Sequence, residues 1–114
     1  MKYTQEMINK LIVIENDKKY MRNHDFDNDD LSSLDMRNII FQNCRFINAN
    51  LTDADLRYAD LINANLFRAN LFRANLINAD LTGTNLSGTD LTNANTTNTN
   101  FTDANLTNLI GYTK

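Results

Sequence analysis

Residues 49–108 read, in groups of five, ANLTD ADLRY ADLIN ANLFR ANLFR ANLIN ADLTG TNLSG TDLTN ANTTN TNFTD ANLTN, twelve consecutive units without an insertion. The third residue is Leu in ten of the twelve units, the first is Ala or Thr, and the second is always Asn or Asp. A short fixed period of this kind indicates a solenoid, in which successive turns of one chain stack on each other.

A period of five residues excludes both regular secondary structures for this segment. On an α-helix, five residues advance a side chain by about 140° beyond a full turn, so the leucines would point all around the helix. On a straight β-strand an odd step alternates the faces, so every second Leu would face water. The remaining solution is a chain that turns a corner at every unit and keeps Leu and the small residue inside. With four sides to a turn, equivalent residues of successive turns stack at the strand spacing of about 4.8 Å.

The motif Ala-(Asn/Asp)-Leu-X-X resembles the repeat of the pentapeptide-repeat family. The resemblance implies an all-β solenoid, namely a right-handed quadrilateral β-helix with four repeats per coil. It covers residues 34–110, because three further pairs of apolar residues keep the same register. These pairs are Leu34 and Met36, Ile39 and Phe41, and Cys44 and Phe46.

The register also predicts where the coils begin. If it extended back to Phe26, two polar side chains, His24 and Asp29, would point into the coil. We therefore expect the first coil to begin near Leu31. The sixteen units from Leu31 to Ile110 then make about four coils.

The predicted organisation has three parts: an N-terminal capping segment in residues 1–30, the β-helix in residues 31–110 and a tail in residues 111–114. Residues 5–14 carry apolar side chains at helical spacing, so a short helix is expected to cover the N-terminal end of the core. These side chains are Met7, Ile8, Leu11, Ile12 and Ile14.

The C-terminal end has no comparable helix, although an open solenoid end exposes both strand edges and core. Proteins that resemble this chain often pair through that end, which favours a homodimer. A plug formed by the last aromatic residue is the alternative. The residues of the candidate dimer end are Leu106, Leu109, Ile110 and Tyr112.

A second candidate interaction surface lies in residues 61–80, where the residue after each Leu is apolar instead of Thr or Ser. Two arginines follow the phenylalanines and are expected to cover them with their stems. Apolar surface of this extent indicates a protein interface, unless stacking between coils or the N-terminal segment covers it. Two outward residues of the preceding coil, Ile47 and Tyr58, lie next to this segment by the 20-residue spacing. We call the whole set the apolar belt; it consists of Ile47, Tyr58, Ile62, Phe67, Arg68, Phe72, Arg73 and Ile77.

Catalysis, cofactors and metals find little support in the sequence. The chain has one His and one Cys, which is too few for a catalytic set built on those residues. Cys44 occupies an inward position and is expected to be a buried, inert thiol. Residues 24–30 resemble the start of a calcium loop, but Asp30 stands where Gly is needed and Met36 where a bidentate Glu is needed. No cofactor, metal or catalytic residue is predicted.

The net charge and the hydropathy of the chain restrict the kinds of partner that it is expected to bind. A net charge of -3 argues against direct binding to nucleic acid, because binding to phosphates requires a basic surface. The apolar run in residues 11–14 is too short for a signal-peptide core or a membrane span. We therefore expect a cytoplasmic protein that neither binds nucleic acid directly nor inserts into a membrane.

These observations predict a non-catalytic scaffold that binds a protein partner or a second copy of itself. The alternative is a DNA-mimicking effector of DNA gyrase, because some pentapeptide-repeat proteins resemble duplex DNA, bind gyrase and protect it from quinolones. Residues 31–114 carry seven acidic and six basic residues and lack the strongly acidic surface of such a mimic. Gyrase supercoiling that is unaffected by excess protein would exclude this alternative.

Overall fold

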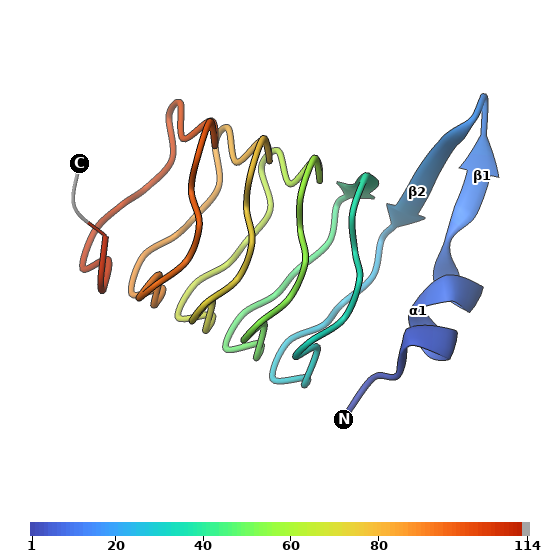
Figure 1. Cartoon of the computed structure of the whole chain (residues 1–114), viewed down its shortest axis with the longest axis horizontal. Helices are drawn as coiled ribbons and strands as arrows, with labels where there is room; N and C mark the ends of the chain where they lie inside the picture. Colours follow the sequence, from blue (N-terminus) through green and yellow to red (C-terminus); the bar gives the residue numbers. More distant parts are fainter. Residues whose placement is uncertain (113–114) are drawn as a thin grey trace.

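The computed structural model describes residues 1–112 and shows a β-solenoid with a helix and a hairpin at one end (Figure 1). In chain order the elements are helix α1 (Gln5–Leu11) and strands β1 (Val13–Glu15), β2 (Lys18–Arg22) and β3 (Ile39–Gln42). The remaining chain winds in coils that stack along the longest dimension of the molecule (Figure 1). Of the predicted C-terminal tail, residues 113–114 lie outside the described residues.

Parallel β-bridges join residues that are 20 apart along the solenoid, as between Asp25 and Arg45. Backbone hydrogen bonds accompany the bridges. The Leu51 N–H donates to the Asn70 carbonyl at 2.7 Å, and the Asn70 N–H donates to the Ala49 carbonyl at 2.9 Å. Each coil therefore takes 20 residues, or four pentapeptides, as the repeat predicts.

The corner between two sides explains why the second residue of most units is Asn or Asp. In the unit that starts at Ala49, the Oδ1 atom of Asn50 accepts a hydrogen bond from the Thr52 N–H at 3.0 Å. The next residue, Asp53, has a φ of 58°, and the chain then closes a turn in which the Ala54 N–H donates to the Leu51 carbonyl. Asn and Asp tolerate this left-handed conformation and bond to nearby backbone, so they favour a turn in each unit.

The core consists of the inward side chains of successive coils. Every third-position residue from Met21 to Leu91 is buried. The rings of Phe26 and Phe46, one coil apart, stack with their centroids 5.3 Å apart. Where an inward position holds a polar residue, as at Thr84, its hydroxyl donates to a backbone carbonyl 2.8 Å away. The column of large and small residues thus forms one continuous core along the solenoid.

The coils begin earlier in the chain than the predicted start near Leu31. Strand β2 pairs in parallel with β3, one coil further on, and β1 pairs with β2 in an antiparallel hairpin. Met21 and Phe26 are fully buried in the same columns as the leucines. The polar residues that argued for the later start therefore lie within the first coil.

These two polar residues, His24 and Asp29, each have a polar partner in the N-terminal segment. The hydroxyl of Tyr3 and the Nε2 atom of His24 form a hydrogen bond of 3.0 Å. Asp29 pairs with the amino group of Met1 at 3.1 Å. An inward polar group costs little once it has a partner, so the register extends back through this unit.

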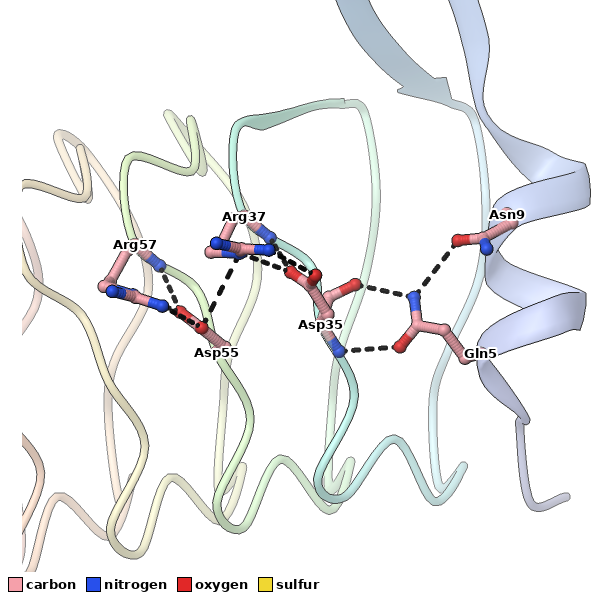
Figure 2. Close-up of polar contacts among 6 residues, drawn as sticks. All are labelled: Gln5, Asn9, Asp35, Arg37, Asp55 and Arg57. Carbon is pink, nitrogen blue, oxygen red and sulfur yellow. Dashed lines mark hydrogen bonds and ion pairs between the residues drawn. The ribbon is translucent and has the colours of Figure 1, made fainter.

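The N-terminal segment also covers the strand edges of the first coil. Thr4 caps α1 by accepting a hydrogen bond from the Met7 N–H, and Ile8 is fully buried. The side-chain amide of Gln5 both accepts from the Asp35 N–H at 2.7 Å and donates to the Asp35 carbonyl at 2.8 Å (Figure 2). This amide replaces the peptide group that a preceding coil would supply.

A second side of the first coil pairs with the first residues of the chain. The Tyr3 N–H donates to the Asp30 carbonyl at 2.9 Å, and the Asp30 N–H donates to the Met1 carbonyl at 2.7 Å. The β1–β2 hairpin covers a third side. The chain therefore covers three of the four sides at the N-terminal end of the solenoid.

Candidate interaction surfaces

The structure distributes the apolar belt around the solenoid instead of gathering it on one face. Neighbouring coils bring Ile47 close to Phe67 and Tyr58 close to Ile77. Asn48, the residue after Ile47, donates its N–H to the Phe67 carbonyl, and the Tyr58 N–H donates to the Ile77 carbonyl. The 20-residue period places Ile62 on one side, Ile47 and Phe67 on the next, Phe72 on the third, and Tyr58 and Ile77 on the fourth. A single flat partner therefore cannot contact the whole belt.

Two arginines shield the phenylalanines of the belt. The guanidinium carbon of Arg68 lies 5.1 Å from the ring centroid of Phe67, and that of Arg73 lies 5.2 Å from the ring of Phe72. Arg73 also makes a bidentate pair with Asp53, with both N–O distances at 2.9 Å. Cation–π contacts of this kind cover apolar rings while the charge stays in water. Both rings are half-buried, so they offer less apolar surface than the sequence suggests.

Three belt residues adopt a backbone conformation that suits neither Tyr nor Arg. The fifth residue of each unit is left-handed, and it is usually Asn, Asp or Gly. Tyr58 has a φ of 60°, and Arg68 and Arg73 each have a φ of 56°. Bulky residues pay a steric cost in this region, and such strain concentrates at functional sites. The sequence alone could have shown this departure, because Tyr58, Arg68 and Arg73 stand at the fifth position, where most units have Asn, Asp or Gly.

An ion-pair ladder runs along one side of the first coils (Figure 2). Arg37 makes two hydrogen bonds to Asp35, at 2.9 and 2.8 Å, and Arg57 makes two to Asp55, at 2.9 and 2.7 Å. Arg37 also lies 3.7 Å from the Asp55 carboxylate in the next coil. Sequence reasoning missed this ladder, although the same Asp-X-Arg spacing recurs one coil later. The ladder neutralises the arginines and continues into the helix through Gln5 (Figure 2).

Acid is expected to weaken this ladder. Hydrogen bonds from Arg37 are the main cause that lowers the pKa of Asp35 from its ordinary 3.8 to about 2. Because the folded pKa is depressed, the stabilisation is complete above about pH 4 and is lost as the pH falls through about 2. Urea titrations should show a shallower loss of stability over this window in Asp35→Asn than in the wild type.

Asp103→Asn is the matched control, because Asp103 makes no ion pair within residues 1–112. Its acid dependence should equal that of the wild type. An equally steep acid dependence in Asp35→Asn would refute the contribution of the ladder.

The C-terminal end contrasts with the covered N-terminal end. In the last coil the inward residues Phe101, Leu106 and Leu109 are half-buried, and Ile110 is 52% exposed. Tyr112 packs against Phe101 with the ring centroids 5.2 Å apart. The tyrosine therefore covers one side of this end and leaves the other core residues partly open.

The side chains that the sequence offered for catalysis or metal binding make contacts within the fold. Cys44 is buried, its Sγ atom lies 3.4 Å from the Met21 carbonyl, and burial raises the pKa of the thiol. In the segment that resembles a calcium loop, Asp25 accepts a hydrogen bond from the Asp27 N–H, and Asp27 pairs with Arg45. Within the described part of the chain, no three His, Cys, Asp or Glu side chains gather to bind a metal.

Residues 1–112 also contain no helix of the length and hydrophobicity that a membrane crossing requires.

Comparison with solved structures supports the architecture. A pentapeptide-repeat protein, Rfr23 from the cyanobacterium Cyanothece 51142, is 35% identical, with 82% of this chain and 64% of that chain covered and a TM-score of 0.78. HetL from Nostoc sp. strain PCC 7120, a pentapeptide-repeat protein involved in heterocyst differentiation regulation, is 26% identical, with 83% of this chain and 51% of that chain covered and a TM-score of 0.60. This chain thus spans less than two thirds of either protein.

A third structure, the plasmid-mediated fluoroquinolone resistance protein QnrB1, is 20% identical, with 79% of this chain and 54% of that chain covered. Its TM-score of 0.41 gives no support for a shared function. Among curated protein sequences, none matches this chain. The family model described as pentapeptide repeats matches eight copies in residues 30–68 and 69–108. With its uninterrupted repeats and its all-β solenoid, the chain belongs to the pentapeptide-repeat family.

Proposed function

We propose that this pentapeptide-repeat protein is a non-catalytic scaffold that binds a protein partner and pairs with a second copy through its C-terminal end. One observation carries the proposal: within residues 1–112, the chain covers most of its N-terminal end, whereas the inward residues of the last coil are only half-buried. A half-exposed solenoid core is stabilised by a further layer, which a second copy can supply. The filled core and the buried Cys44 support a role in binding instead of catalysis.

The covered end determines which assembly can form. Gln5, the hairpin and the first three residues already occupy three of the four strand edges that a head-to-tail contact would need. Contact between two C-terminal ends is isologous, so it closes after two copies and does not continue into a filament. The scaffold would then be a closed dimer, with the sides of both solenoids available to other proteins.

The proposal includes the finer architecture that the sequence predicts, a right-handed coil of about four turns, and a location in the cytoplasm. It does not include DNA mimicry. Arg37, Arg45, Arg57 and Arg73 each pair with an aspartate, so these carboxylates are neutralised and do not imitate a row of phosphates.

Light scattering during size-exclusion chromatography tests the assembly. The wild type is expected to elute with twice the chain mass of 13.1 kDa. Leu106→Asp combined with Ile110→Asp should give a monomer, because two carboxylates would be buried without partners in the contact. A monomeric wild type would contradict the proposed dimer.

The control for this experiment is Phe67→Asp combined with Phe72→Asp. Both residues lie on the sides of the solenoid and away from its C-terminal end, so this variant should remain a dimer. Loss of the dimer in the control alone would place the contact on the belt and overturn the end-to-end arrangement.

A further inference from the structure

Most of the large apolar side chains that remain exposed lie near the hairpin. Val13 and Ile14 are in β1, while Tyr58 and Ile62 lie on the coil after β3. The exposed set consists of Met1, Val13, Ile14, Tyr58, Ile62 and Ile110. This concentration differs from the predicted belt, whose other apolar members are half-buried.

The sheet register places several of these residues on one outward face. Val13 lies opposite Tyr20, and Tyr20 lies opposite Ile40, so the three side chains form a row across the sheet. Ile40 bridges to Asp60, and Ile62, two residues later, points to the same face. Tyr58 stands at the adjacent corner. We call Val13, Tyr20, Ile40, Tyr58 and Ile62 the hairpin face.

Two depressions meet at Tyr58, which is 60% exposed. The first, of about 220 Å³, is lined by Arg37, Asn38, Arg57 and Tyr58. The second lies below the tip of the hairpin and is lined by Asp17, Lys18, Lys19, Asn38, Ile40 and Tyr58. An apolar side chain of a partner would contact both Tyr58 and Ile40 in the second depression.

Tyr58 occupies this place at a steric cost. Its φ of 60° is the conformation that Asn adopts one coil earlier, at Asn38, and one coil later, at Asn78. The tyrosine ring is not buried in the core, so packing of the core does not offset the strain. Strain that persists at an exposed aromatic residue points to a binding role.

The charges around the depression favour an acidic partner. Lys18 and Lys19 make no ion pair within the described part of the chain, and with Asp17 they give the lining of the second depression a net charge of +1. Asp60, which bridges to Ile40, lies outside this lining. Arg37 and Arg57 add no net charge, because each pairs with a carboxylate. Complementary charge steers a partner and selects its orientation.

We propose that the hairpin face binds a short segment of another protein in which an apolar side chain adjoins a carboxylate. The apolar side chain packs against Tyr58 and Ile40, and the carboxylate pairs with Lys18 or Lys19. This inference rests on the proposed scaffold function and names the chemistry of its partner.

Two other occupants fit this surface less well. A second copy related by a two-fold axis through this face would bring the Lys18 and Lys19 pairs of the two copies toward each other, and like charges repel. A nucleic acid needs a strongly basic surface, whereas the lining of the second depression carries a net charge of only +1. A short segment with one carboxylate beside an apolar side chain needs only the small positive charge that Lys18 and Lys19 provide.

A library of random short peptides displayed on phage tests the proposal. Selection on the full-length wild type, with removal of phage that bind Tyr58→Asn, should recover peptides that combine Asp or Glu with aromatic or aliphatic residues. Recovered peptides should bind at least about tenfold more weakly to Tyr58→Asn and to Lys18→Glu combined with Lys19→Glu, since both replacements remove central contacts. Tyr58→Asn should keep the fold, because Asn suits the left-handed conformation.

Arg68→Asn is the matched control. It relieves the same backbone strain at a different corner of the coil and should bind the peptides as the wild type does. The proposal would be overturned if the selection recovered no peptide that distinguishes the wild type from Tyr58→Asn. It would also be overturned if the recovered peptides were rich in basic residues.

Light scattering separates this inference from the proposed dimer. Loss of the dimer in Tyr58→Asn would identify a second copy as the occupant of the hairpin face and would also overturn the inference. A monomeric wild type that still selects acidic, apolar peptides would refute the dimer alone.

Discussion

Leu66→Ala should lower the free energy of unfolding by about 3 kcal/mol, the usual cost of removing a buried leucine side chain and leaving a cavity. Leu66 is fully buried, with Phe46 and Leu86 in the same column of the adjacent coils. Leu106 lies two coils further along this column and is only half-buried. Leu106→Ala should therefore cost about 1 kcal/mol or less in the isolated chain. Urea unfolding at low protein concentration measures both values.

Protein concentration gives this comparison a second readout. If two C-terminal ends pair, Leu106 becomes buried in the contact, and its replacement should cost more as the concentration rises. The cost of Leu66→Ala should change little over the same range, because its surroundings belong to one chain. Equal losses for the two variants at the lowest concentration would show that the C-terminal end is already covered within the monomer.

The repeat predicts most of the fold because each column of the pentapeptide obeys one packing rule. Leu and Ala fill the core, Asn or Asp closes the turn, and equivalent residues stack in the next coil. The start of the coil could not be predicted in this way. His24 and Asp29 look unfavourable inside a core until Tyr3 and Met1, more than 20 residues earlier, are known to pair with them.

The cap illustrates a different limit. The hydrophobic spacing of residues 5–14 predicts a helix, and α1 confirms it for residues 5–11. The prediction is wrong for Ile14, which lies in strand β1 and is exposed because β1 turns back along β2. The two hydrogen bonds between Gln5 and Asp35 depend on where the helix docks, which local sequence does not encode. The polar surface of the cap therefore became visible only in the structure.

The candidate site was only partly predictable. Departures from the repeat in residues 61–80 identified Ile62, and Tyr58 followed from the 20-residue spacing. The sequence did not show that Val13 and Tyr20 share a face with Ile40, because this requires the pairing of the hairpin with the coil. Ile40 itself carried a usable signal, since it replaces the Asn or Asp that closes most units.

Ile8→Asp should have the largest effect of any replacement in the N-terminal segment. Ile8 is fully buried at the covered end, so the change removes an apolar side chain and buries a carboxylate without a partner. We expect the free energy of unfolding to fall by about 4 kcal/mol or more. Because each coil of a solenoid is stabilised mainly by its neighbours, the damage should begin in the first coil. Hydrogen exchange should show that the amides of Met21 and Phe26 lose protection before those of the central coils.

Ile14→Asp is the matched control, because the same change occurs in the same segment at a residue that is 69% exposed. It should alter stability by about 0.5 kcal/mol or less, as is usual for surface replacements. Ile8→Ala, which makes the cavity without the charge, should fall between the two. The order of the three variants follows from the burial of Ile8 and from the cost of a buried carboxylate. An Ile8→Asp protein as stable as Ile14→Asp would show that α1 does not cover the core in solution. The polar residues His24 and Asp29 would then have lost the partners that place them inside the first coil, and its start would move back toward Leu31.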